Sequence, residues 1–163
     1  MAMVFAFGFY VNRKRLGCSI YGVMLVAFLI GVCINVSQEM GGNPRIDAMG
    51  IAQDDGAMEG KEVRLGAGAT GLWSVVTTVT SNGSVNGMHD STMPLSGMIE
   101  MLNMQINTWF GGVGVGWMNY FTFIIIAVFI SGLMVGRTPE FMCHKVEAKE
   151  MKIASIVAVS YTH

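Results

Sequence analysis

The residues whose types and spacing suggest chemistry lie in an uncharged segment, residues 66–89. Its first part is apolar, and its second part consists largely of hydroxyl residues, asparagines and glycines, with Gly83 between Asn82 and Ser84. The segment is too polar at its end to cross a membrane and too apolar to be a surface loop. A short apolar helix followed by such a loop is typical of a re-entrant pore loop, whose backbone carbonyls replace the water shell of an ion. The segment therefore predicts cation permeation.

Two neighbouring residues at the end of this segment, His89 and Asp90, are candidates for a metal site or a proton relay. Neither has a second ligand at the spacing typical of a metal site, so we expect His89 to make a structural hydrogen bond. Asp90 is expected to cap the helix that follows or to hold the loop. The cysteines predict no disulfide framework, because Cys18 and Cys33 would lie roughly 22 Å apart on one helix.

Methionines are frequent after the polar loop and leave a second hypothesis open. Thioethers bind Cu(I), so a copper-binding membrane protein is an alternative, although methionine at roughly helical spacing is more often an adaptable packing surface. Glu100 lies among them as an acid on an apolar segment, which makes it a functional candidate. The methionines concerned are Met88, Met93, Met98, Met101 and Met104.

The composition indicates that most of the chain contacts lipid. Hydrophobic residues make up 52% of the 163 residues and charged residues only 13%, about half the charged share of a soluble domain. Residues 16–38 and 101–136 carry no charge, and each is long enough for the ~20 apolar residues of a membrane helix. The net charge of -1 gives no sign of a nucleic-acid partner.

The basic residues predict the orientation. A cluster at residues 13–15 precedes the first long apolar segment and another follows the last, so we expect both on the cytoplasmic side. Residues 1–11 are then the end of a preceding membrane helix, 12–15 a cytoplasmic turn, 16–38 a membrane helix and 39–65 an extracytoplasmic loop. That loop has more acidic than basic residues, which would favour cation entry or simply keep the loop solvated.

The number of crossings constrains the rest of the chain. If residue 16 leaves the cytoplasm and residue 137 is back in it, residues 66–90 must enter and leave on one side, as a pore helix and filter loop do. Residues 91–136 would be roughly 69 Å long as one helix, about twice the hydrocarbon thickness. We therefore expect a broken membrane helix with its glycine-rich break at residues 111–116. This break is either a gate lining a pore or a site of close helix packing.

Four blocks of sequence carry a resemblance to a known family. They lie at residues 58–62, 77–91, 110–114 and 132–140, and they are collinear and correctly spaced. The chain resembles the potassium-binding subunit of the bacterial Kdp potassium-transporting ATPase over about residues 1–158. The resemblance implies an all-α membrane protein built as a potassium-channel-like repeat of helix, re-entrant pore loop and broken helix, and this chain is similar to the third of four such repeats.

The resemblance also implies the site residues. The potassium filter would be formed by Thr80, Ser81, Asn82, Gly83 and Ser84, the first four contacting the ion through carbonyl oxygens, with Val85 and Asn86 packing behind. Gly83 has the most specific role, since only glycine adopts positive φ freely. The gating segment would comprise Gly111, Gly112, Gly114 and Gly116. No metal ion other than potassium is implied.

The resemblance further implies high-affinity potassium uptake, driven by ATP, in the bacterial inner membrane. The partners would be a P-type ATPase catalytic subunit, small accessory subunits and the lipid bilayer. The alternatives are a potassium-uptake subunit of the Trk or Ktr kind and a non-transporting membrane scaffold. The local sequence around residues 88–91 and 136–140 favours Kdp over the Trk or Ktr kind.

Nothing in the chain predicts ATP hydrolysis. It contains neither a Gly-x-x-x-x-Gly-Lys-Ser/Thr phosphate loop nor an Asp-Lys-Thr-Gly phosphorylation sequence. We expect a non-catalytic subunit that binds no nucleotide and docks its partner through the cytoplasmic segment 137–152, unless this segment is merely an exposed amphipathic helix. Residues 153–163 are expected to start a membrane helix that is truncated and has an atypical tail, so the isolated fragment is expected to be incomplete.

Overall fold

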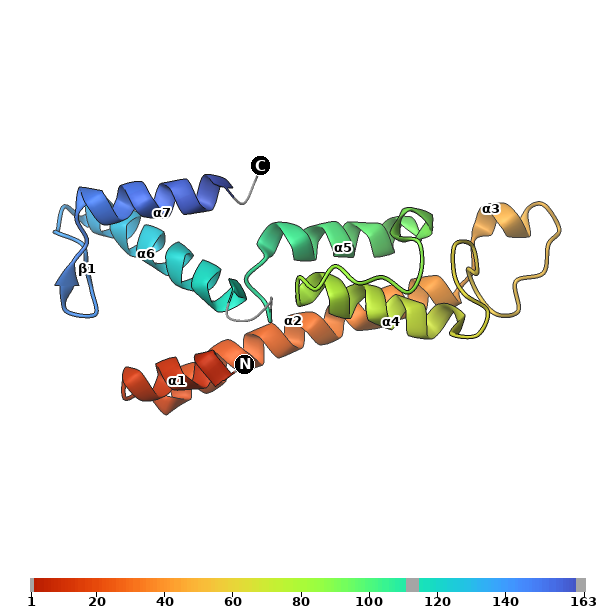
Figure 1. The fold of residues 1–163 in the computed structure, drawn as a ribbon, viewed down its shortest axis with the longest axis horizontal. Helices are drawn as coiled ribbons and strands as arrows, with labels where there is room; N and C mark the ends of the chain where they lie inside the picture. Colours follow the sequence, from red (N-terminus) through yellow and green to blue (C-terminus); the bar gives the residue numbers. More distant parts are fainter. Residues whose placement is uncertain (1, 111–114, 161–163) are drawn as a thin grey trace.

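The computed structural model describes residues 2–110 and 115–160 of the chain. Within these residues the fold is mostly helical, with one short hairpin, and Figure 1 shows its elements. In chain order they are α1 (Ala2–Tyr10), α2 (Lys14–Met40), α3 (Pro44–Asp47), α4 (Gly66–Val79), the 3-10 helix η1 (His89–Ser91), α5 (Pro94–Ile106), α6 (Val115–Val135), β1 (Glu140–Phe141), β2 (His144–Lys145) and α7 (Ala148–Ser160).

Helices α1 and α2 form a tight hairpin. The chain turns at Asn12, whose φ of 56° is in the left-handed region that asparagine tolerates. Gly8 and Gly17 lie where the two helices touch, and a Cβ added to Gly8 would come within 3.2 Å of the Cα of Gly17. The absence of side chains at both positions allows this backbone contact.

Two segments of the described chain have the length and apolar composition of membrane-spanning helices, Lys14–Asp47 and Gly116–Val135. Only 11% and 6% of their most apolar stretches are buried within the chain. A core helix of a soluble protein would be mostly covered, so the apolar surface of these two segments needs another apolar environment.

Helices α4 and α5 lie side by side over one end of α2 (Figure 1). Val75 and Val79 of α4 and Ile99 of α5 are buried between them, and Phe28 and Val32 of α2 pack against this cluster. Burying such side chains contributes about 1.5–3 kcal/mol each. This small core holds α4 at a fixed position on α2.

The segment between α2 and α4 is held by specific hydrogen bonds and by a pairing with a distant residue. The side chain of Gln53 hydrogen-bonds both the N–H and the carbonyl of Asn43, and Lys61 pairs with Gly87 as an isolated β-bridge. The hypothesis of a simply solvated loop is therefore wrong for Lys61, whose ammonium group is buried.

The segment of residues 91–136 is interrupted between Ile106 and Val115, so the interruption begins ahead of the predicted glycine-rich break. Helix α5 ends at Ile106, and α6 begins at Val115. The interruption thus starts at Asn107, before the glycine-rich segment, and Gly116 is already helical. Asn107 adopts φ 42° and ψ 27°, a conformation that ends a helix. Gly111, Gly112 and Gly114 lie outside the described residues.

The segment after α6 is also different from its prediction. Residues 140–145 form an antiparallel hairpin in which Glu140 pairs with Lys145 and Phe141 with His144. An amphipathic helix over residues 137–152 is wrong, because this hairpin lies within the segment and its turn residues Met142 and Cys143 have φ of 51° and 66°. Helix α7 starts at Ala148, five residues earlier than expected, and packs on α6.

Candidate functional site

The C-terminus of α4 leads directly into the candidate filter loop, residues 80–84. The N–H of Ser81 donates to the carbonyl of Thr78 at 3.4 Å, and the N–H of Asn82 donates to that of Thr77 at 3.1 Å. This pair of bonds is the Schellman motif, which requires a left-handed residue directly after the helix cap. Ser81 supplies it with a φ of 52°, at a cost of about 1–2 kcal/mol for a residue with a Cβ. The loop therefore leaves the helix in a strained but defined direction.

The other end of the loop is tied back to the same helix at Ser84. The hydroxyl of Thr77 donates to the Ser84 carbonyl at 2.7 Å, and the indole N–H of Trp73 donates to it at 3.2 Å. Two donors from α4 therefore bind this oxygen, and Ser84 anchors the loop. That Ser84 belongs to the filter, with the carbonyls of residues 80–83 contacting the ion, stays a prediction.

Gly83 lies between the two anchors. Its φ is +75°, as its expected role requires, and a Cβ added there would meet nothing within 4 Å. The glycine is therefore needed for its backbone conformation, since space is not limiting.

Val85 does not pack behind the loop as expected. It is 60% exposed in this chain. The loop is bonded to α4 at Ser84 and pairs with Lys61 at Gly87, and Val85 lies between these two attachments without a covering element.

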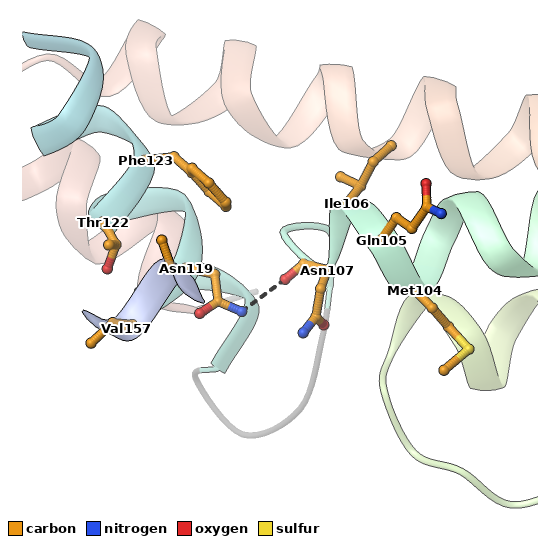
Figure 2. Close-up of a pocket in the computed structure, with 9 residues that line it drawn as sticks. Met104, Gln105, Ile106, Asn107, Asn119, Thr122, Phe123 and Val157 are labelled. Carbon is orange, nitrogen blue, oxygen red and sulfur yellow. Dashed lines mark hydrogen bonds between the residues drawn. The ribbon is translucent and has the colours of Figure 1, made fainter. Parts of the chain in front are cut away.

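A third attachment links the loop to the broken helix. The hydroxyl of Ser81 donates to Oδ1 of Asn107 at 2.7 Å. The carbonyl of Asn107 in turn accepts from Nδ2 of Asn119 at 3.1 Å, as Figure 2 shows. The loop is thus connected through one residue to the end of α5 and the start of α6.

Two cavities flank this connection. One of about 340 Å³ lies beside the filter loop and is lined by Ser81, Gly83 and His89 among others. The other, of about 540 Å³, lies between the end of α5, α6 and α7, and Figure 2 shows its lining. Met104 and Asn107 line both cavities.

A set of buried polar side chains supports α4 from behind. Nδ2 of Asn35 on α2 donates to Oγ of Ser74 on α4 at 2.8 Å. Glu39, at the end of α2, accepts from the N–H of Met93 at 2.9 Å and pairs with Lys61. These contacts attach α4 and α5 to the same end of α2 and so fix the position from which the loop starts.

His89 and Asp90 do not form a metal site in the described residues. Nδ1 of His89 lies 3.7 Å from Oε2 of the buried Glu100. Two of the candidate functional residues, His89 and Glu100, therefore lie against each other. Asp90 does not cap α5, because that helix starts four residues later at Pro94, with Met93 at its N-cap position. Among the described residues no group of three or more His, Cys, Asp or Glu side chains is placed to hold a metal ion.

Four residues of this site have no role in the predictions from the sequence: Trp73, Thr77, Lys61 and Asn107. The signal for Thr77 and Trp73 was their place on the helix before the loop. For Asn107 it was an asparagine just ahead of the break, a type that favours left-handed helix ends. The buried Lys61 had no local signal, because it looked like one of several charges in a polar segment.

Comparisons with known proteins agree on one family. The family model described as "Potassium-transporting ATPase A subunit" matches residues 1–162. Similar proteins, each named "Potassium-transporting ATPase potassium-binding subunit", occur in Phocaeicola vulgatus (87% identity over 159 residues), Bacteroides thetaiotaomicron (86% over 159 residues) and Flavobacterium johnsoniae (59% over 158 residues).

These alignments cover 97–98% of this chain and 28% of each relative, so the chain spans about 28% of the length of these relatives. The matches do not favour the Trk or Ktr alternative or the copper-binding alternative. Because the family model extends over nearly all of its residues, the chain belongs to the family of potassium-transporting ATPase A subunits.

Proposed function

We propose that residues 66–90 form a re-entrant pore helix and one filter loop of a potassium-conducting subunit. The carbonyl oxygens of Thr80, Ser81, Asn82 and Gly83 are the proposed potassium ligands. The observation that carries this proposal is the double attachment of the loop to α4, through the Schellman motif at Ser81 and the two donors on the Ser84 carbonyl. A filter replaces the water shell of the ion with backbone carbonyls, and bonds at both ends of the loop restrict where its carbonyls lie.

One such loop is not a complete filter. A carbonyl filter surrounds the ion with several loops around one axis. The relatives are more than three times as long as this chain, and the resemblance to a four-repeat channel implies that the remaining loops come from the rest of such a subunit.

The proposed complex supplies the energy from another chain. The subunit binds potassium and no nucleotide, has no catalytic centre of its own, and works with a P-type ATPase subunit and small accessory subunits. The names of the relatives, which are potassium-binding subunits of a potassium-transporting ATPase, support this division of labour. The proposed location is the bacterial inner membrane, which the chain crosses more than once.

The proposed topology retains the sequence-based orientation. Residues 12–15 and 137–152 face the cytoplasm, residues 39–65 face the opposite side, and residues 66–90 enter and leave on that same side. The break between α5 and α6, together with the glycine segment 111–116, is the proposed gating region. Asn107, which directly follows α5 and bonds to Ser81 of the loop, supports a gate close to the filter.

Gly83 gives the direct test. Residues 1–158 of this chain would replace the matching segment of the Phocaeicola vulgatus subunit, and the chimera would be purified with its ATPase partners. Potassium-stimulated ATP hydrolysis is then measured with potassium and with sodium. Gly83→Ala is expected to raise the potassium concentration for half-maximal activity about tenfold, which corresponds to about 1.4 kcal/mol, because alanine resists a φ of +75°.

Gly50→Ala is the matched control. Gly50 has a φ of +77°, and a Cβ added there also meets nothing within 4 Å. The backbone strain is therefore similar, while the position is remote from the filter loop in sequence. Equal potassium activation in the Gly83 and Gly50 variants would show that residues 80–83 do not bind the ion.

A further inference from the structure

Asn107 makes contacts with the filter loop and with α6 through different atoms. Its amide Oδ1 accepts the hydroxyl of Ser81 at 2.7 Å, while its backbone carbonyl accepts Nδ2 of Asn119 at 3.1 Å. Figure 2 shows the carbonyl facing Asn119 and the amide group pointing elsewhere. Its own N–H donates to the carbonyl of Asn103 and closes α5. Three segments therefore meet at this one residue.

The conformation of Asn107 is what allows the three contacts together. At φ 42° and ψ 27° the residue is left-handed, so its backbone leaves the helix direction. Ser81 is also left-handed, at the end of α4. The hydrogen bond between Ser81 and Asn107 thus joins the ends of α4 and α5, where the backbone leaves each helix and changes direction.

This bond acts on a proposed ion ligand. The Ser81 carbonyl direction depends on the backbone dihedrals of residues 81 and 82, and serine carries an energetic cost in the left-handed region. A hydrogen bond from its hydroxyl to a fixed acceptor favours this conformation over the competing ones. The acceptor is fixed in turn, because Asn107 is bonded to α5 and to the buried Asn119 on α6.

We propose that Asn107 is a positioning residue of the filter: it holds Ser81 in the conformation that presents its carbonyl to potassium, and it links that conformation to the position of α6 through Asn119. The proposal rests on the proposed function, since it assumes that residues 80–83 bind the ion. Its specific content is that ion discrimination depends on a side chain outside the loop, on the residue that directly follows α5.

The test uses the same chimera in its ATPase complex. Asn107→Gly removes Oδ1 while glycine keeps the left-handed helix end and the backbone carbonyl that Asn119 binds. Ser81→Ala removes the donor from the other side. For the ATPase activity, we compare the sodium concentration and the potassium concentration that each give the half-maximal rate. Each single change is expected to lower the ratio of these two concentrations about fivefold, because one hydrogen bond contributes about 1 kcal/mol. The double variant is expected to lose no more than either single one, since both remove the same bond.

Two further variants separate positioning from folding. Asn107→Asp keeps an Oδ1 acceptor and tolerates the left-handed conformation, so it should retain discrimination that Asn107→Gly loses. Asn12→Gly is the control, because Asn12 is also left-handed, at φ 56°, but lies in the turn between α1 and α2. It should leave discrimination unchanged. Asn119→Asp, which removes the Nδ2 donor, should shift discrimination in the same direction as Asn107→Gly.

The outcomes distinguish this inference from the proposed function. If Asn107→Gly keeps full discrimination while Gly83→Ala loses it, the filter assignment stands and the role of Asn107 is wrong. Additive losses in the Ser81 and Asn107 double variant would also overturn that role. Unchanged discrimination in Asn119→Asp would overturn the link to α6. If Gly83→Ala has no effect beyond that of Gly50→Ala, the proposed function itself is contradicted, whatever the Asn107 variants show.

Discussion

Lys61 and Glu39 form an ion pair that is withdrawn from solvent. Nζ of Lys61 lies 2.6 Å from Oε2 of Glu39, and the two side chains are 1% and 0% exposed. Lys61 also donates to the carbonyl of Ala57 at 2.6 Å, and Oε1 of Glu39 accepts from the N–H of Met93. One pair of charges therefore joins the segment before α4, the end of α2 and the start of α5.

Lys61→Met is expected to destabilise the protein strongly. The change leaves the Glu39 carboxylate buried without its counter-charge, which costs about 3–5 kcal/mol. Thermal unfolding of the chimera in detergent should show a clearly lowered midpoint, and adding Glu39→Gln should recover part of the loss. Arg64→Met is the control, because Arg64 and Glu62 form an exposed pair at 3.8 Å, worth at most about 1 kcal/mol. Equal midpoints for Lys61→Met and Arg64→Met would contradict this role.

Thr77→Val is expected to loosen the filter loop without unfolding the helix. Valine has nearly the shape of threonine but cannot donate to the Ser84 carbonyl, so this carbonyl retains only the longer bond from Trp73. A lost hydrogen bond of this kind costs about 1 kcal/mol, and potassium-over-sodium discrimination should fall about fivefold.

Thr70→Val is the matched control for Thr77. Thr70 is buried on the same helix, but its hydroxyl donates to the carbonyl of Gly66 within α4. Discrimination should stay at the unmodified level in this variant. A fall of the same size in both variants would mean that general loosening of α4, and not the Ser84 bond, is responsible.

Gly17→Leu is expected to separate α1 from α2. A Cβ at this position would lie 3.2 Å from the carbonyl oxygen of Val4 and 3.4 Å from the Cα of Gly8, so a leucine has no room. The expected cost is about 1–3 kcal/mol, and trypsin should cleave faster at Arg13 in the turn. Gly22→Leu on the same helix should be tolerated, because a Cβ there meets nothing within 4 Å. Equal cleavage rates for the two leucine variants would argue against this helix contact.

Cys143 offers a test of the proposed orientation. It is exposed in the hairpin between β1 and β2, which we place in the cytoplasm. A membrane-impermeant maleimide should label it in inside-out vesicles and not in spheroplasts, with Cys18 and Cys33 replaced by serine. In a second variant that also lacks Cys143, Asp54→Cys should show the opposite labelling pattern. Labelling of both positions from the same side would contradict the topology.

Several features of this chain could be predicted from residues close together in the sequence. The uncharged runs predict the two long apolar helices, because lipid-facing surface needs no partner within the chain. Gly83 was expected at a position with positive φ, where a side chain is unfavourable, and its φ is +75°. The long segment after the filter had to be interrupted because one straight helix would exceed the bilayer thickness.

The place of that interruption was harder to predict. Glycine content pointed to residues 111–116, yet α5 ends at Ile106 and Gly116 is helical. Helix propensity is a weak determinant compared with tertiary contacts. Here the end of α5 coincides with the bond between Asn107 and Ser81, a contact that the glycine pattern does not contain.

The family, the two long apolar helices and the positive φ of Gly83 could be predicted from the sequence, since each depends on local residue types. Which groups hold the candidate filter loop follows only from the tertiary structure. Ser81 of the loop and its partner Asn107 are 26 residues apart in the sequence. Glu39 and Met93, which help to hold the helices behind the loop, are 54 residues apart. Hydrogen bonds and ion pairs between such distant groups depend on how α2, α4 and α5 pack, and packing is a property of the folded chain as a whole.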